Sequence, residues 1–156
     1  MDVFSRTFLP AAAETSVPIS TTSRHMPVFR RCVSPNERTV LVARCQRPEQ
    51  HMQGDYLLLL TKRRLVVTHE TLLLRRLRLH LNSELRHLDH VTWTADPRSA
   101  IVELAVTAID GVRERFMIKL GDREHAAHVE ALLSYAFLAQ PVDARTTTAT
   151  TAITAA

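Results

Sequence analysis

Glycine is scarce in this sequence, with three residues among 156. Loops that cradle phosphate groups use several glycines, because the backbone N–H groups must approach the ligand closely. The sequence also contains no GxSxG, HExxH or P-loop motif. These absences argue against hydrolases and nucleotide-dependent enzymes, so we expect a non-enzymatic protein without a cofactor.

Cysteine and long apolar runs are scarce too. Cys32 and Cys45 form no CxxC pair, which indicates two reduced thiols rather than a disulfide framework. No apolar run approaches the roughly 20 residues that a membrane-spanning helix needs. Asp2 and Arg6 interrupt the N-terminus, which does not resemble a secretory signal. We therefore expect a cytoplasmic protein, with peripheral attachment to the inner membrane face as an open alternative.

Both ends of the chain differ in composition from its middle. Residues 1–36 contain four prolines among many Ser and Thr residues, and we expect a disordered N-terminal arm there. Residues 141–156 form a Thr/Ala-rich segment, which we also expect to be disordered. The sequence therefore predicts a single folded domain over residues 37–140.

Within that domain the apolar residues recur with a period of two, which indicates strands. In RLRLHL, for example, Leu77, Leu79 and Leu81 alternate with Arg76, Arg78 and His80, and this predicts one buried face and one face in water. Asp110-Gly111 is a strong hairpin signal. Seven strands are expected, at residues 39–45, 56–61, 64–69, 72–81, 90–95, 99–108 and 112–120.

The period changes to that of a helix after Gly121-Asp122, where Asp122 can cap the N-terminus. The helix is expected to end at Pro141. Its apolar stripe consists of Val129, Leu132, Leu133, Ala136 and Phe137. Seven antiparallel strands followed by one amphipathic helix predict a mainly β fold, a sandwich or barrel closed at one end by the helix.

Two stretches resemble the bacterial pleckstrin-homology-like (PH-like) family and its GRAM relatives. One is LLTKRRLVVT at residues 59–68, and the other is VRERFMIKLGDREHAAHVEALL at residues 112–133. The resemblance covers the whole expected domain and implies a non-enzymatic module that recognises lipids, peptides or proteins. Lipid-binding members resemble each other in a basic motif around the connection between the first two strands. Here that connection holds Arg44 and Arg47 together with the acidic Glu49 and Asp55, so the basic motif is weaker.

Positive charge is concentrated in one part of the chain. Residues 61–88 contain seven Lys and Arg residues against two Glu, a balance of 7 − 2 = +5, whereas the whole chain carries +4. Arginines two positions apart on a strand point the same way and can pair with phosphates. A solvated strand face is the plainer interpretation. The candidate anion-binding or partner-binding residues are Lys62, Arg63, Arg64, Arg75, Arg76, Arg78 and His80.

The histidines and the tryptophan offer weaker signals. His80, His87 and His90, with Asp89, lie close in sequence but lack the paired spacing of zinc sites. We therefore expect surface histidines and no metal site. His125 and His128 flank the helix stripe and raise the alternative of a pH switch. Trp93 is expected in the core.

Three functions remain open for such a module, and two structural features distinguish them. The leading expectation is a protein partner, including self-association, and an exposed apolar patch at Leu72, Leu73 and Leu74 would favour it. The alternative is an anionic membrane surface, which convergence of Lys62, Arg76 and Arg78 would favour. Nucleic-acid binding ranks third, because aromatic content is 5% and no aromatic residue interleaves the arginines.

Overall fold

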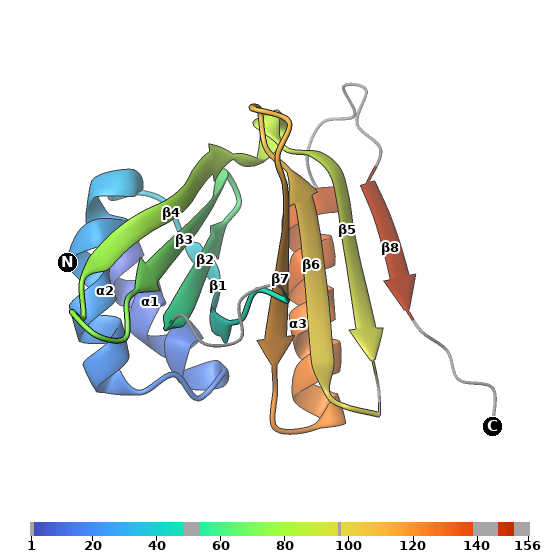
Figure 1. Cartoon of the computed structure of the whole chain (residues 1–156), viewed down its shortest axis with the longest axis horizontal. Coiled ribbons are helices and arrows are strands. Elements are labelled where there is room, and N and C mark those ends of the chain that lie inside the picture. Colours follow the sequence, from blue (N-terminus) through green and yellow to red (C-terminus); the bar gives the residue numbers. More distant parts are fainter. Residues whose placement is uncertain (1, 49–53, 97, 139–146, 152–156) are drawn as a thin grey trace.

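A computed structural model describes residues 2–48, 54–96, 98–138 and 147–151 (Figure 1). Pro97 and Pro141, which the sequence marks as a turn and a helix end, lie outside these residues. The elements are α1 (Val3–Glu14), α2 (Ile19–Cys32), β1 (Thr39–Cys45), β2 (Asp55–Thr61), β3 (Arg64–Glu70), β4 (Leu77–Glu84), η1 (Leu85–His87), β5 (Asp89–Asp96), β6 (Ile101–Thr107), β7 (Arg113–Lys119), α3 (Arg123–Leu138) and β8 (Thr147–Thr151).

The strands form two sheets, and the predicted mainly β fold with a C-terminal helix is confirmed. Sheet A has the order β1-β2-β3-β4, and sheet B has the order β7-β6-β5-β8. Strands β1 to β7 pair with their neighbours in the antiparallel sense within each sheet. A bridge between Gln46 and Met117 joins β1 to β7 at one corner of the sandwich.

The main core lies between the two sheets and α3 (Figure 1). Trp93 is fully buried and its ring stacks on Phe137 of α3, with 5.8 Å between ring centroids. The apolar faces expected for β6, β7 and the helix are confirmed, because Leu104, Phe116 and Leu133 are all fully buried. Burying these leucine and phenylalanine side chains contributes roughly 1.5–3 kcal/mol each to folding.

The structure confirms two turn and capping signals predicted from the sequence, Asp110-Gly111 and Asp122. Gly111 has φ +84°, which the Asp110-Gly111 turn requires, and the Ala108 N–H donates to the Val112 carbonyl at 2.9 Å. At the start of α3, the Asp122 carboxylate accepts the backbone N–H of His125 at 2.8 Å. Hydrogen bonding from His125 holds the pKa of the Asp122 carboxyl below its usual value.

The expectation of a disordered arm over residues 1–36 is wrong. Helices α1 and α2 lie against the outer face of sheet A (Figure 1). Phe4, Phe8 and Phe29 are between 0% and 1% exposed and pack with Val42, Leu57, Leu59 and Val66. This second core outweighs the helix-breaking effect of proline, which costs about 3 kcal/mol inside a helix.

The prolines that predicted disorder interrupt the two helices less than their number indicates. Pro18 and Pro35 lie outside the helices, at the N-cap of α2 and after its end, where a missing N–H is tolerated. Only Pro10 and Pro27 lie within helices. The expectation for residues 141–156 is likewise wrong for five residues, because Thr147–Thr151 form β8 and pair with β5.

The fourth strand is shorter than expected, and its faces differ from the prediction. The expected strand at 72–81 begins only at Leu77. Val67 pairs with Leu81, but Thr68 pairs with Leu79, so His80 is an extra residue in a β-bulge. Because the bulge interrupts the alternation, Leu79 falls on the face opposite to Leu81 and is 47% exposed.

None of the helices that the structure describes is long and apolar enough to span a bilayer.

Candidate functional site

The candidate basic residues do not form one face. Lys62 and Arg63 occupy the turn between β2 and β3, whereas Arg75 and Arg76 occupy the loop between β3 and β4. Strand β3 separates these two groups, and its seven residues span about 20 Å at 3.3 Å per residue. Lys62 therefore does not converge with Arg76 and Arg78, and the arrangement that would favour an anionic surface along the whole basic stretch is not formed.

The other candidates are held by specific partners. The Arg64 side chain donates from Nε to the Glu37 carboxylate at 3.2 Å. His80 turns inward, with Nε2 3.2 Å from the Glu114 carboxylate and its ring edge-on to Tyr56. At the β2–β3 turn, Lys62 Nζ lies 4.6 Å from the ring centroid of Tyr135 on α3. These residues hold the fold together and are not aligned for a common ligand.

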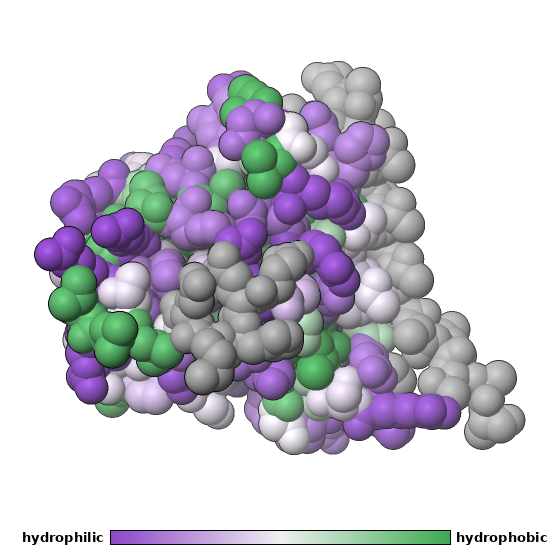
Figure 2. All heavy atoms as spheres, viewed as in Figure 1, coloured by the Kyte–Doolittle hydropathy of each residue, from purple (hydrophilic) through white to green (hydrophobic). Residues whose placement is uncertain are grey.

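The β3–β4 loop, residues 71–76, instead exposes three consecutive leucines. Leu72, Leu73 and Leu74 are 61%, 97% and 69% exposed. The loop is closed by a hydrogen bond from the Thr71 N–H to the Arg76 carbonyl, and Arg75 adopts a positive φ of 46°. Figure 2 shows apolar surface at this end of sheet A, bordered by hydrophilic side chains.

Arginines surround the leucines on the same loop and the following strand. Arg75, Arg76 and Arg78 are all exposed. The loop therefore combines an exposed apolar tip with three cationic side chains, a combination that interfacial amphipathic helices also present. This arrangement, rather than the predicted strand face, is the candidate functional site, and we call it the leucine–arginine loop.

The first strand connection ends beside the last residue of β3, at the same end of sheet A as the leucine–arginine loop. Gly54, just before β2, has φ +96°, and a Cβ added there would lie 2.0 Å from the Glu70 carbonyl oxygen. Only glycine allows this approach to the end of β3. At the other end of that connection, Arg47 Nη2 lies 3.0 Å from the Glu114 carboxylate, which ties it to β7. Residues 49–53 lie outside the described part.

A buried polar cluster lies at the root of the leucine–arginine loop. His25 of α2 is fully buried, with Nδ1 2.6 Å from the Thr68 hydroxyl and Nε2 3.6 Å from the Glu70 carboxylate. Arg24 Nη2 lies 3.1 Å from the same carboxylate. Since Glu70 is the last residue of β3, this cluster anchors α2 directly beside the loop.

We expect the stability of the protein to decrease as pH falls through the histidine range, and His25 to contribute to that decrease. Burial lowers the pKa of His25. The negative charges of Glu70 and Asp55 oppose this shift, whereas the positive charge of Arg24 adds to it. A lowered pKa in the fold means that the unfolded chain binds more protons below about pH 6.5. The stability contribution is present above that pH and is lost as pH falls toward the folded pKa.

Urea denaturation of the wild type and of His25→Gln at pH 7.5 and pH 5.5 measures this contribution. We expect a smaller loss of unfolding free energy on acidification in the variant, because glutamine does not titrate. The comparison isolates His25 from the seven other histidines of the chain. Equal pH dependence in both proteins would contradict the prediction.

Three further histidines lie in separate surface contacts. His87 Nδ1 lies 3.8 Å from Glu84, His125 Nδ1 lies 2.7 Å from Asp122, and His128 Nε2 lies 3.1 Å from Glu14 of α1. Across residues 2–48, 54–96, 98–138 and 147–151, no three His, Cys, Asp or Glu side chains gather as a metal site. Cys32 and Cys45 are free thiols, and burial raises the pKa of both.

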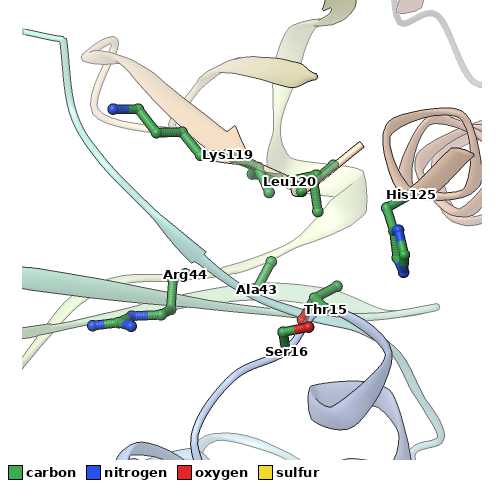
Figure 3. A pocket seen from close by; sticks show the side chains of 9 residues that line it. Thr15, Ser16, Ala43, Arg44, Lys119, Leu120 and His125 are labelled. Atoms are coloured by element: carbon green, nitrogen blue, oxygen red, sulfur yellow. The ribbon is translucent and has the colours of Figure 1, made fainter. Parts of the chain in front are cut away.

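A pocket between the end of α1, β1, β7 and the start of α3 is a weaker candidate (Figure 3). Thr15, Ala43 and Leu120 line its centre, while the side chains of Arg44 and Lys119 extend away from His125 (Figure 3). The Arg44 guanidinium donates to Asp55 at 3.2 Å. Arg44 and Lys119 therefore point away from His125, and Arg44 is already paired with Asp55, so the pocket does not gather these groups around a shared anion.

The sequence analysis named Leu72–Leu74 as a patch whose exposure would favour a protein interface, but it did not count them among the site residues because it placed them in a strand. A signal was present, since successive side chains of a strand point to opposite faces and three consecutive leucines cannot all be buried on one. The buried cluster of His25, Glu70 and Arg24 had no signal in the sequence. It forms only because α2 docks on β3. Thr68, the β3 residue that contacts His25, is 43 residues away from it in the sequence.

Comparisons with known proteins inform the fold alone. No family model matches this chain, and no curated protein matches it. Among solved structures, the hSac2 domain from the human phosphoinositide phosphatase Sac2 is similar with a TM-score of 0.57 and 11% identity, covering 88% of this chain and 91% of that one. The DH/PH domains of p115-RhoGEF are similar with a TM-score of 0.50 and 9% identity, covering 85% of this chain and 38% of that one.

These likenesses show a PH-like fold, as the sequence resemblance implied. The narrower resemblance to bacterial and GRAM members finds no support in them. A PH-like fold is consistent with a binding module in general, and what such a module binds must be argued from its own surface.

Proposed function

We propose that this chain is a non-enzymatic PH-like binding module that attaches peripherally to anionic membranes through its leucine–arginine loop. The exposure of Leu72, Leu73 and Leu74 by itself favours a protein partner as much as a membrane. The observation that supports the membrane is that the exposed Arg75, Arg76 and Arg78 stand directly beside these leucines. In this proposal the leucines enter the lipid interface and the arginines face the headgroups. The module then acts at the cytoplasmic face of a membrane, where anionic lipids are found.

The magnitudes favour an apolar contribution larger than the electrostatic one. Burying a leucine side chain contributes about 1.5–3 kcal/mol, whereas a cationic residue near an anionic surface contributes about 1 kcal/mol. Three leucines and three arginines are available on the loop and the start of β4. Anionic lipid should therefore strengthen binding, and binding should persist in part at physiological salt, unlike a purely electrostatic attachment.

Vesicle flotation of the full chain tests the proposal, with Leu73→Asp as the decisive variant. We expect the wild type to float more strongly with phosphatidylserine-containing vesicles than with phosphatidylcholine vesicles. Leu73→Asp should reduce the bound fraction at least tenfold, because a carboxylate replaces the deepest apolar contact. Leu73 is 97% exposed, so folding should be unaffected.

Matched variants keep this test specific. Ile109 is 83% exposed on the β6–β7 turn, outside the loop, and Ile109→Asp should float like the wild type. The double variant Arg75→Glu/Arg76→Glu should lose binding, whereas Lys62→Glu/Arg63→Glu at the opposite end of β3 should retain it. Equal flotation of Leu73→Asp and wild type would reject the leucine–arginine loop as the membrane contact.

A protein partner is the second candidate, and the exposed leucine patch is the observation that favours it. Leu79, 47% exposed, lies on the strand that follows the loop and enlarges the apolar surface beyond Leu72–Leu74. Absence of flotation, combined with self-association that Leu73→Asp abolishes in sedimentation experiments, would favour this function over the membrane. Nucleic-acid binding is not proposed, because Tyr135, the exposed aromatic residue, lies beside Lys62 and not beside the loop.

A further inference from the structure

Strand β5 is flanked on one side by β6 and on the other by the C-terminal segment of the chain. Residues Thr147–Thr151 pair with Val91–Ala95 over five consecutive positions. This pairing is parallel, whereas the pairs that the structure describes among β1 to β7 are antiparallel. Without these five residues, β5 would be an open edge presenting unpaired N–H and C=O groups to other chains.

The sequence of the added strand indicates how it is held. It reads TTATT, with β-branched threonines that suit a strand and no large apolar residue. Its attachment therefore depends on main-chain hydrogen bonds, which carry little sequence information. A strand held in this way is specified mainly by proximity, so an identical segment from another molecule fits the same edge equally well.

The connection to this strand is long enough for exchange between molecules. Eight residues, 139–146, separate the end of α3 at Leu138 from Thr147. An extended connection of that length reaches roughly 30 Å at about 3.3–3.6 Å per residue. A short linker of this kind gives the segment an effective concentration on the order of mM at its own β5 edge.

We propose that the β5 edge is a docking site for the C-terminal strand of a second copy of this chain. A reciprocal exchange of residues Thr147–Thr151 keeps every strand pair of the two monomers and needs no new contact. The exchanged dimer therefore dissociates with a constant near the effective concentration, on the order of mM. Self-association through this edge is weak at micromolar concentration and increases where the protein is concentrated locally.

Cysteine pairing across the edge tests the proposal. Thr94 of β5 is exposed and lies directly opposite Thr150 of β8. Neighbouring strands are about 4.8 Å apart, and disulfides form at Cα separations of 4.4–6.8 Å. Two full-length chains of different tag length, one carrying Thr94→Cys and the other Thr150→Cys, are mixed and oxidised gently. Both carry Cys32→Ser, so that the remaining native thiol is the buried Cys45.

We expect a mixed disulfide whose yield increases between 10 µM and 1 mM protein, at least tenfold above a control pair. The control pairs Thr150→Cys with Ile109→Cys, which is 83% exposed on the β6–β7 turn and not on the β5 edge. An excess of a synthetic peptide of residues 144–156 should suppress the mixed disulfide, since it competes for the same edge.

A single chain that carries both Thr94→Cys and Thr150→Cys provides the reference. An intrachain disulfide in this chain, together with mixed disulfide at the control level at 1 mM, would overturn the exchange. It would mean that β5 pairs only with the C-terminal strand of its own molecule. Absence of both disulfides would overturn the strand pairing itself. Neither outcome depends on membrane binding, because β5 and the leucine–arginine loop belong to different sheets.

Discussion

Replacing Phe29 with alanine is expected to destabilise the protein by about 3–4 kcal/mol. Phe29 lies in the N-terminal segment, which the sequence predicted to be disordered. Phe29 is fully buried, and its ring centroid lies 5.7 Å from that of Phe8. The substitution opens a cavity between α1, α2 and sheet A, which the surrounding side chains fill only in part. Urea denaturation followed by circular dichroism measures the loss.

The control for this prediction is Leu9→Ala on α1. Leu9 is 48% exposed, and we expect a loss below about 1 kcal/mol because no cavity forms. Amide hydrogen exchange of residues 3–32 in the wild type gives a second readout, with protection expected for both helices. If Phe29→Ala unfolds with the same midpoint as the wild type, α1 and α2 do not contribute to the fold.

Replacing Glu37 with alanine is expected to cost about 2–4 kcal/mol, because this carboxylate connects the end of the N-terminal segment to sheet A. Its side chain is 4% exposed and accepts hydrogen bonds from the Ser34 N–H at 3.2 Å, the Thr61 hydroxyl at 2.9 Å and Arg64 Nε at 3.2 Å. Removing it leaves the Thr61 hydroxyl and the 22% exposed Arg64 guanidinium without this partner.

Two variants separate the charge of Glu37 from its position. Glu37→Gln keeps an acceptor for Ser34 or Thr61 and should lose less stability than Glu37→Ala. Glu103→Ala removes an ion pair of similar length, 2.8 Å to Arg115, but with side chains 33% and 46% exposed. We expect a loss below about 1 kcal/mol there, since water screens exposed pairs. Equal losses for Glu37→Ala and Glu103→Ala would show that burial of Glu37 does not matter.

Most of the strands could be predicted from the sequence because their signals are local. Val102, Leu104 and Val106 alternate along β6, and all three are fully buried. The Asp110-Gly111 turn and the helix stripe of Val129 and Leu133 are equally local patterns. Each depends on side-chain periodicity within one element, so no knowledge of distant residues is needed.

The N-terminal helices could have been predicted from two signals that proline content obscured. Phe4, Phe8, Ala11 and Ala12 recur with a helical period, and all four are buried. Strands β2 and β3 are apolar on both faces, as the run from Leu57 to Leu60 shows, and such strands require cover on both sides. Because sheet B and α3 cover only one side, another part of the chain had to cover the other.

The candidate site could be predicted only in part. The sequence located the positive charge and named Leu72–Leu74 as residues whose exposure would matter. It placed Lys62 and Arg76 on one face because both belong to a single basic stretch. The strand between them puts them at opposite ends of sheet A, since a hairpin reverses direction at each turn and β3 is about 20 Å long.

By itself, the sequence determined the elements: seven strands, their turns and the final helix, because alternation and turn chemistry are properties of neighbouring residues. Tertiary structure alone decided which elements cover which faces. It brought α2 onto β3, so that His25 meets Glu70, and it placed the bulge at His80 that turns Leu79 outward. These outcomes depend on the burial of surfaces distant in the chain, and the free energy of that burial is not encoded in any local period.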